Sequence, residues 1–248
     1  MKPTPARNYF GKASLLPARR PCRQYALRLT LTALWIGVSG CGGAAFTGGS
    51  VPIGKAALTG RVVRSEDATL PLANAQIAIV ATPQNSDAKI LHATTDQNGV
   101  FNVTDIPTDA VSGAVTVTAA SADGAFRAQQ VSFRLNNNHS ASVIFALPPA
   151  NYTPAIGTTL TISPAHLTAQ PGQRVLVTAL LRAPGGVPLA LTPTLFFDDS
   201  FGLLNPDGSF TASDAGTGDI VAYWYNGLTS SATVSVSQME LALPPAPP

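Results

Sequence analysis

The stretch TTDQNGVFNV, residues 94–103, says most about the fold of this chain. Asn98 and Gly99 are residue types that adopt positive φ readily, so the pair predicts a tight hairpin turn. Asp96 precedes them at a spacing from which a carboxylate accepts hydrogen bonds from backbone amides of the turn. Alternation of side chains along the following strand then places Phe101 in a core. The stretch therefore predicts two β-strands joined by a tight turn.

The same kind of pattern extends outward through residues 55–148. Apolar residues alternate with Thr and Ser, and Gly, Pro, Asn and Asp interrupt the runs at short intervals, which is typical of β-sandwiches. The strands expected here are residues 57–64, 75–81, 90–95, 100–103, 114–121, 127–135 and 141–147. The residues expected to face inward include Phe101, Val103, Val115, Val117, Ala119, Val131, Phe133 and Leu135.

This block resembles the carboxypeptidase regulatory-like domain, a transthyretin-like sandwich. The resemblance is carried by LTGRVV, PLANAQIAI and TTDQNGVFNVTDIP. It implies a module that lacks the zinc ligands of the enzyme after which the family is named. The chain contains no His-x-x-Glu, and its three histidines, His92, His139 and His166, are scattered. We therefore expect no metal and no cofactor.

Asp96 and Asn98 also raise the question of calcium. A calcium loop needs oxygen ligands at several alternating positions and usually closes with an acidic residue. Here the turn is followed by Val100 and Phe101, which the strand requires. The pattern favours turn chemistry over a metal site.

Residues 158–238 form a second block with the same period-2 pattern. Turns are expected at Pro171-Gly172 and at Pro206-Asp207-Gly208, where Asp207 and Gly208 have structural roles. The residues expected to face inward are Val175, Val177, Ala179, Leu181, Phe210, Ala232, Val234 and Val236. The block resembles a bacterial immunoglobulin-like domain in LTISPAHLTAQPGQRVLVTALL, GLLNPDGSFTASDAGTGDIVAYWY and SATVSV. The whole chain is thus expected to be all-β, with two tandem β-sandwich domains.

Two strands of the second block have more apolar residues than that resemblance implies. We expect Phe196 on one strand, and Ile220, Ala222 and Trp224 on its neighbour, to face inward. The residues next to them then face outward and form an aromatic patch of Leu195, Phe197, Val221, Tyr223 and Tyr225. Exposed aromatic clusters of this kind are often interaction sites.

Three other interpretations of this patch remain open. A register error of one residue would move these side chains into the core. In the second interpretation, the first block covers the patch and makes it an internal interface. In the third, the two strands are half covered and have no role.

The segment LTLTALWIGVSGCGG, residues 29–43, precedes both blocks. Its apolar run of about ten residues is short for a membrane span, and the leader before it is basic, which is the layout of a signal peptide. Val38-Ser39-Gly40-Cys41 resembles the bacterial lipobox. The resemblance implies cleavage before Cys41, lipid attachment to its sulfur, and stable anchoring by two or more acyl chains. Gly42 lacks the negative charge associated with inner-membrane retention, so we expect the outer membrane or the cell surface.

Cleavage there changes the charge of the protein. The full chain carries 15 basic and 13 acidic residues, and seven of the basic residues lie before Cys41, which leaves 8 against 13, a net −5. No basic patch remains to bind nucleic acid. Cys22 leaves with the leader and Cys41 would be lipidated, so no disulfide is expected.

The expected organisation follows from these segments. It comprises a signal peptide (1–40), a lipidated cysteine with a flexible tether (41–54), the first sandwich (55–148), a Pro-rich linker (149–157), the second sandwich (158–238) and a Pro-rich tail (239–248).

No catalytic motif is recognisable. Gly-x-Ser-x-Gly, P-loop and dinucleotide-binding patterns are absent, and the adjacent acidic residues Asp198-Asp199 are expected in a solvated loop. We expect a non-enzymatic, lipid-anchored envelope protein that binds an unknown protein or polysaccharide or acts as a spacer. One alternative is a carbohydrate-binding module that uses Tyr223, Trp224 and Tyr225, and another is an accessory subunit of an envelope enzyme or transport complex.

Overall fold

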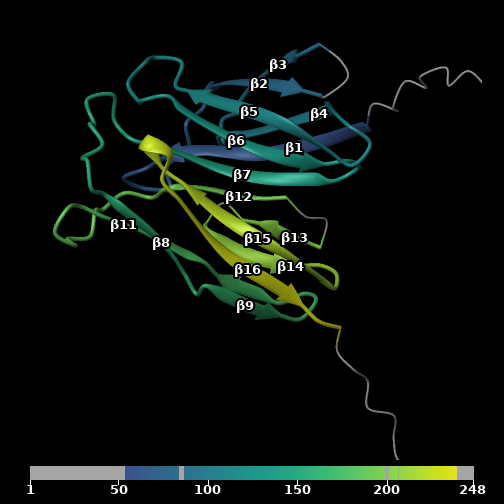
Figure 1. Cartoon of the computed structure of the whole chain (residues 1–248). Helices are drawn as coiled ribbons and strands as arrows, with labels where there is room; N and C mark the ends of the chain where they lie inside the picture. The colour runs from purple at the N-terminus through teal and green to yellow at the C-terminus, as the bar shows by residue number, and fades with distance from the viewer. Residues whose placement is uncertain (1–53, 84–86, 199–200, 206, 239–248) are drawn as a thin grey trace, which may run out of the picture. The chain divides into compact units, whose positions relative to one another are not determined.

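The computed structural model describes residues 54–83, 87–198, 201–205 and 207–238 (Figure 1). The predicted signal peptide, Cys41, most of the tether and the tail lie outside the described residues, as do Asp199 and Pro206. Across the described ranges the chain is all-β, with one short 3-10 turn. None of these residues belongs to a helix long and apolar enough to cross a bilayer.

The elements follow one another in the order β1 (Gly54–Arg64), β2 (Gln76–Thr82), β3 (Lys89–Thr94), β4 (Val100–Thr108), β5 (Ser112–Ala120), β6 (Gln129–Asn136), β7 (Ser140–Leu147), β8 (Thr159–Ser163), β9 (His166–Ala169), β10 (Arg174–Leu176), β11 (Thr178–Arg182), β12 (Thr194–Phe197), β13 (Gly202–Leu204), β14 (Ser209–Ala212), β15 (Gly216–Tyr223), η1 (Tyr225–Gly227) and β16 (Thr229–Val236).

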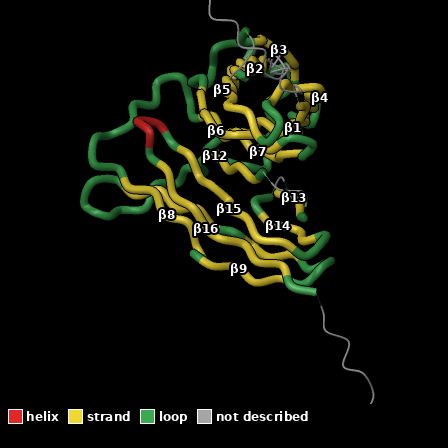
Figure 2. Tube along the Cα trace, turned by 45° about the vertical axis from the view of Figure 1, so that its right-hand side comes forward, coloured by secondary structure: helices red, strands yellow, loops and turns green. Residues whose placement is uncertain are grey.

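One sheet runs through both predicted sandwiches. Its seven strands have the order β4-β1-β7-β12-β15-β16-β9. The two blocks meet where β7 and β12 pair antiparallel, with Leu195 opposite Ile144 and Phe196 opposite Val143. Figures 1 and 2 both show β12 beside β7. Backbone hydrogen bonds therefore join the two blocks directly.

The first core lies between this sheet and a second sheet of order β3-β2-β5-β6. All the side chains expected to face inward in this block are buried there, which confirms the predicted alternation. Phe101 and Phe145 have ring centroids 6.5 Å apart near its centre. Phe196 of the second block completes this core by stacking on Phe133, with centroids 3.8 Å apart.

The second core lies under the opposite face of the seven-stranded sheet. Two small sheets, β10-β14-β13 and β11-β8, contribute to it. Phe197, Phe201 and Phe210 pack edge to face at its centre, with Phe197 and Phe210 centroids 4.9 Å apart. Ile144 and Ala146 of the first block complete this core.

The turn at residues 96–100 joins β3 to β4, and these strands belong to different sheets. It is therefore a corner of the sandwich, which corrects the predicted hairpin. The Asp96 carboxylate accepts the amides of Asn98 and Val100 at 2.9 and 2.8 Å. Gly99 has a φ of +73°, whereas Asn98 is not in the positive-φ region. A Cβ on Gly99 would lie 2.5 Å from the Val62 carbonyl, so both conformation and space require glycine.

The turn between Asn205 and Ser209 has the same pair of backbone hydrogen bonds as the turn between Asp96 and Val100, but it closes a true hairpin. The Gly208 amide donates to the Asn205 carbonyl at 2.9 Å, and the Asp207 carboxylate accepts the Ser209 amide at 3.1 Å. It connects β13 and β14, which pair directly. Gly208 has a φ of +82°, and a Cβ there would meet no atom closer than 3.6 Å.

Candidate functional site

The predicted aromatic patch is not an exposed surface. Leu195 and Phe197 are 4% and 0% exposed and belong to the second core, while Tyr223 is half-buried and packs against the first core. Val221 and Tyr225 are also half-buried. This corrects the expectation that the five side chains share one outward face.

The physical reason is that β12 lies in the sheet that separates the two cores, with the first core on one face and the second core on the other. Neither face of β12 is therefore free to be the solvent side. Phe196 lies opposite Val221, whereas Leu195 lies opposite Ala222. The inward positions of Ile220 and Ala222 were predicted correctly, but Phe196 faces the other core.

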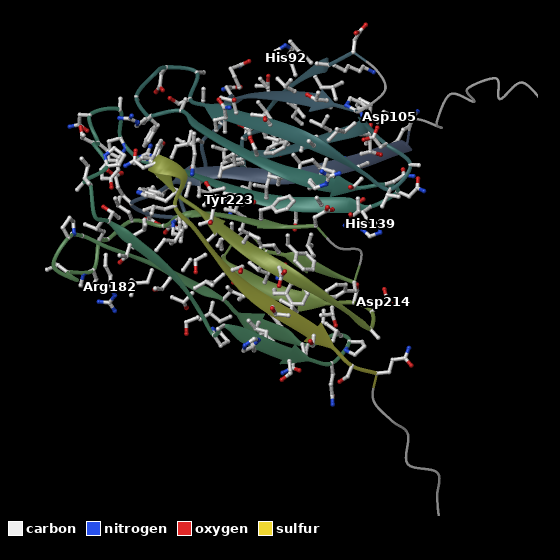
Figure 3. The ribbon with its side chains drawn as sticks, viewed as in Figure 1. His92, Asp105, His139, Arg182, Asp214 and Tyr223 are labelled. Atoms are coloured by element: carbon white, nitrogen blue, oxygen red, sulfur yellow. The ribbon has the colours of Figure 1, made fainter. Side chains whose placement is uncertain are left out.

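A groove of about 470 Å³ lies close to the predicted patch, where the two sandwiches meet. We call it the junction groove. Its lining consists of two runs of consecutive residues, 127–132 around the start of β6 and 223–229 from the end of β15 to the start of β16. Figure 3 labels Tyr223, which lies where the strands of the two blocks meet. The volume is within the range usual for ligand pockets.

An aromatic corner of Tyr152, Trp224 and Tyr225 adjoins this groove, and Trp224 and Tyr225 also line it. Arg127 lies over the Tyr225 ring, with its guanidinium carbon 5.2 Å from the centroid, and donates to the Tyr152 carbonyl at 3.0 Å. The Tyr152 ring packs edge to face on Trp224 at 5.7 Å. The Tyr225 hydroxyl donates to the Arg127 carbonyl at 3.0 Å, and burial raises the pKa of Tyr225 and of Tyr223.

Trp224 does not offer a flat aromatic platform at the groove. It is 4% exposed, and its indole N–H is buried without an acceptor among the described residues. Because stacking on a sugar needs an exposed ring face, the predicted set Tyr223, Trp224 and Tyr225 cannot act together as a carbohydrate platform in this arrangement.

A buried polar network fixes the position of β6 beside the groove. Gln129 is 2% exposed, and its carbonyl oxygen accepts a 2.6 Å bond from the Thr194 hydroxyl. Thr194 in turn accepts the Ala146 amide at 3.2 Å, and the Gln129 amide donates to the Tyr223 carbonyl at 3.5 Å. These bonds tie β6, β7, β12 and β15 together.

The groove residues of β6 were not identified from the sequence. One signal was present, since Gln129 falls on the inward register of Val131 and Phe133. A polar side chain at such a position needs a buried partner. The partner, Thr194, is 65 residues away, and the local pattern does not indicate it.

Acidic and imidazole side chains do not gather at the groove. In the described part of the chain, no three of the His, Cys, Asp and Glu side chains are grouped as a metal site would require. Figure 3 shows His92 and His139 on different parts of the first sandwich. Asp198, expected in a solvated loop, is half-buried and accepts the Asn136 amide at 2.9 Å.

No family model matches this chain, and no curated protein matches it. Among solved structures it is similar to (S)-allantoin synthase, at 11% identity and a TM-score of 0.29, over 41% of this chain and 44% of that one. It is also similar to invasin, a bacterial integrin-binding protein, at 18% identity and a TM-score of 0.23, over 76% and 40%. A third is BcpA, the major pilin subunit of Bacillus cereus, at 11% identity and a TM-score of 0.27, over 75% and 69%.

The matched regions span less than half of the first two of these proteins. Likenesses at such low identities and TM-scores do not indicate a function for this chain.

Proposed function

We propose that this chain is a non-enzymatic envelope protein, anchored by lipid on Cys41, that binds a ligand in the junction groove. The groove is the observation that carries the proposal. It combines half-buried tyrosines with backbone and side-chain polar groups, which is the usual make-up of a recognition site. We place the anchor in the outer membrane on the basis of the Val38-Ser39-Gly40-Cys41 motif and Gly42.

The continuous sheet supports a binding role for the groove. Its two walls come from different blocks, which ordinarily move relative to each other when a flexible linker joins them. Here the ladder between β7 and β12 and the Gln129–Thr194 bond hold the walls in place. A groove held in this way loses little conformational freedom when a ligand enters.

A capture experiment with a matched pair of variants tests the groove. Thr229 and Thr217 are exposed threonines at opposite ends of the β15–β16 ladder, and only Thr229 lines the groove. The full chain, purified in detergent, is immobilised and exposed to solubilised envelope proteins and, separately, to envelope polysaccharide. We expect Thr229→Arg to abolish retention of the ligand and Thr217→Arg to preserve it. Equal retention by both variants would remove the groove from the proposal.

The anchor is tested separately in cells. We expect Cys41→Ser to abolish incorporation of labelled palmitate and to release the protein from the membrane fraction. Labelling that persists in this variant would contradict lipidation at Cys41.

A further inference from the structure

The strand β6 has a free edge that borders the junction groove. Among the described strands it is the last of its sheet and pairs with β5 alone. In antiparallel pairing, the N–H and C=O of a residue point to the same side, and successive residues alternate sides. The Asn137 amide bonds back to the Val111 carbonyl at 2.7 Å, whereas the Asn136 amide bonds outward to Asp198. Even-numbered residues of β6 therefore direct their backbone groups away from β5.

Side chains from the second block close both ends of this edge. At one end the Asp198 carboxylate accepts the Asn136 amide at 2.9 Å. At the other, the Tyr225 hydroxyl lies 3.3 Å from the Ala128 carbonyl. The outward residues between these ends are Gln130, Ser132 and Arg134. Their backbone groups have no hydrogen-bond partner in the described ranges.

An unpaired edge of this kind is a template for another strand. Protein edges are usually protected by proline, bulges or a covering segment. The middle of the β6 edge contains no proline, and the register of the β5–β6 ladder is regular along its whole length. Gln130 and Ser132 line the groove, so its contents can reach these backbone groups.

The face of the seven-stranded sheet next to this edge has room for one extended chain. The seven-stranded sheet continues past β12 to β15 and β16, whereas the sheet above it ends at β6. No described strand covers the upper face of β15 there, and Val221 and Tyr223 on that face are half-buried. Two packed sheets lie about 10 Å apart, which leaves room for one strand beside β6.

We infer that the ligand is an extended polypeptide segment of a partner protein that adds to the free edge of β6 as a fifth strand. This inference rests on the proposed groove function and specifies its ligand. The segment pairs with the backbone groups of Gln130 and Ser132 and extends toward Arg134. Alternate side chains of the segment face Val221 and Tyr223, so apolar residues are preferred at every second position.

Proline scanning of the edge tests this inference. A proline at residue 130 or 132 removes an outward N–H and leaves the bonds to β5 intact, because those N–H groups do not point toward β5. The matched controls Gln130→Ala and Ser132→Ala keep the N–H. The probe is a displayed library of random dodecapeptides, selected on the full chain in detergent. We expect selected peptides to bind Gln130→Pro and Ser132→Pro about tenfold more weakly than wild type, and both alanine variants with unchanged affinity.

Hydrogen exchange gives an independent readout. Bound peptide should slow exchange of the amides of Gln130, Ser132 and Arg134 in the wild-type chain. Circular dichroism establishes whether each proline variant folds. If a variant does not fold, the exchange pattern of the wild-type chain with bound peptide decides whether the peptide pairs with β6. Unchanged binding to folded proline variants, protection confined to other residues, or a library that yields no binder overturns the inference.

Other outcomes show whether strand addition alone fails or whether the proposed groove function fails with it. Polysaccharide that is lost in Thr229→Arg but retained by the proline variants overturns strand addition and leaves the groove function standing. A concentration-dependent dimer that the proline variants abolish identifies a second copy of this chain as the occupant, which overturns a separate partner. Failure of every probe to respond to Thr229→Arg removes both proposals.

Discussion

Strands β7 and β12 differ from β5 and β6 in how they use their two faces. In β5 and β6, alternate side chains enter the first core and the others face water. In β7 and β12 nearly every side chain is buried, and neighbours along the strand enter different cores. Each core therefore depends on residues from the other block, and the blocks are not two separate packing units.

Alanine substitutions on both kinds of strand provide the strongest test of this difference. We expect Phe196→Ala and Phe197→Ala, adjacent on β12, each to lower the free energy of unfolding by about 3–5 kcal/mol, because each leaves a cavity in a core. On β6, Phe133→Ala should have a similar cost, and the exposed Gln130→Ala should stay within about 0.5 kcal/mol. Urea unfolding measures all four. A cost near zero for either β12 variant would mean that one face of that strand is not packed.

The two glycine turns offer a smaller contrast between the blocks. Both Gly99→Ala and Gly208→Ala place alanine in the left-handed conformation, which costs about 1–2 kcal/mol. Gly99→Ala also forces a Cβ against the Val62 carbonyl, whereas Gly208→Ala makes no such contact. We therefore expect the free energy of unfolding to fall more in Gly99→Ala than in Gly208→Ala. Thermal melting of the two variants checks the order, and equal losses would contradict the close approach of Gly99 to β1.

Alkaline pH should give the smallest effect, and it concerns the tyrosines beside the groove. Burial raises the pKa of Tyr223 and Tyr225 above the value of about 10 expected in the unfolded chain. Because the folded-state pKa is raised, the two tyrosines make a contribution to the free energy of unfolding that is fully present below about pH 10. That contribution is lost as the pH rises above this value. We expect unfolding midpoints to fall above about pH 10 and to fall less in Tyr225→Phe. The same slope in both proteins would show that Tyr225 does not contribute.

Strands with a local alternating pattern can be predicted well from the sequence. The sheet shared by the two blocks cannot. The inward faces of β5, β6 and β16 follow directly from their period-2 patterns, because each strand has one dry face. Phe196 and Phe197 do not follow from such a pattern, since the pairing of β12 with β7 joins residues far apart in the chain. A signal was available in the uninterrupted apolar runs VIFAL of β7 and LFF of β12, which are typical of strands buried on both faces.

The candidate groove was harder to predict than the fold. Tyr223, Trp224 and Tyr225 of its lining were singled out from the sequence, but the facing wall on β6 is largely a backbone edge, which carries no distinctive residue type. Gln129 was the one side chain whose position in the pattern pointed to a buried partner. The free edge of β6 depends on which strands are neighbours, a property of the whole sheet order.

The shared sheet also determines how the molecule would respond to force. Strand β1 begins at Gly54 and pairs along its length with β4 on one side and with β7, in parallel, on the other. Tension applied at Gly54 along the strand would act on these ladders in shear, so many hydrogen bonds would bear the load together rather than open one at a time. Through β7 the load reaches β12 and the second block without crossing a flexible joint. The described part of the chain would therefore transmit a pull as a stiff element.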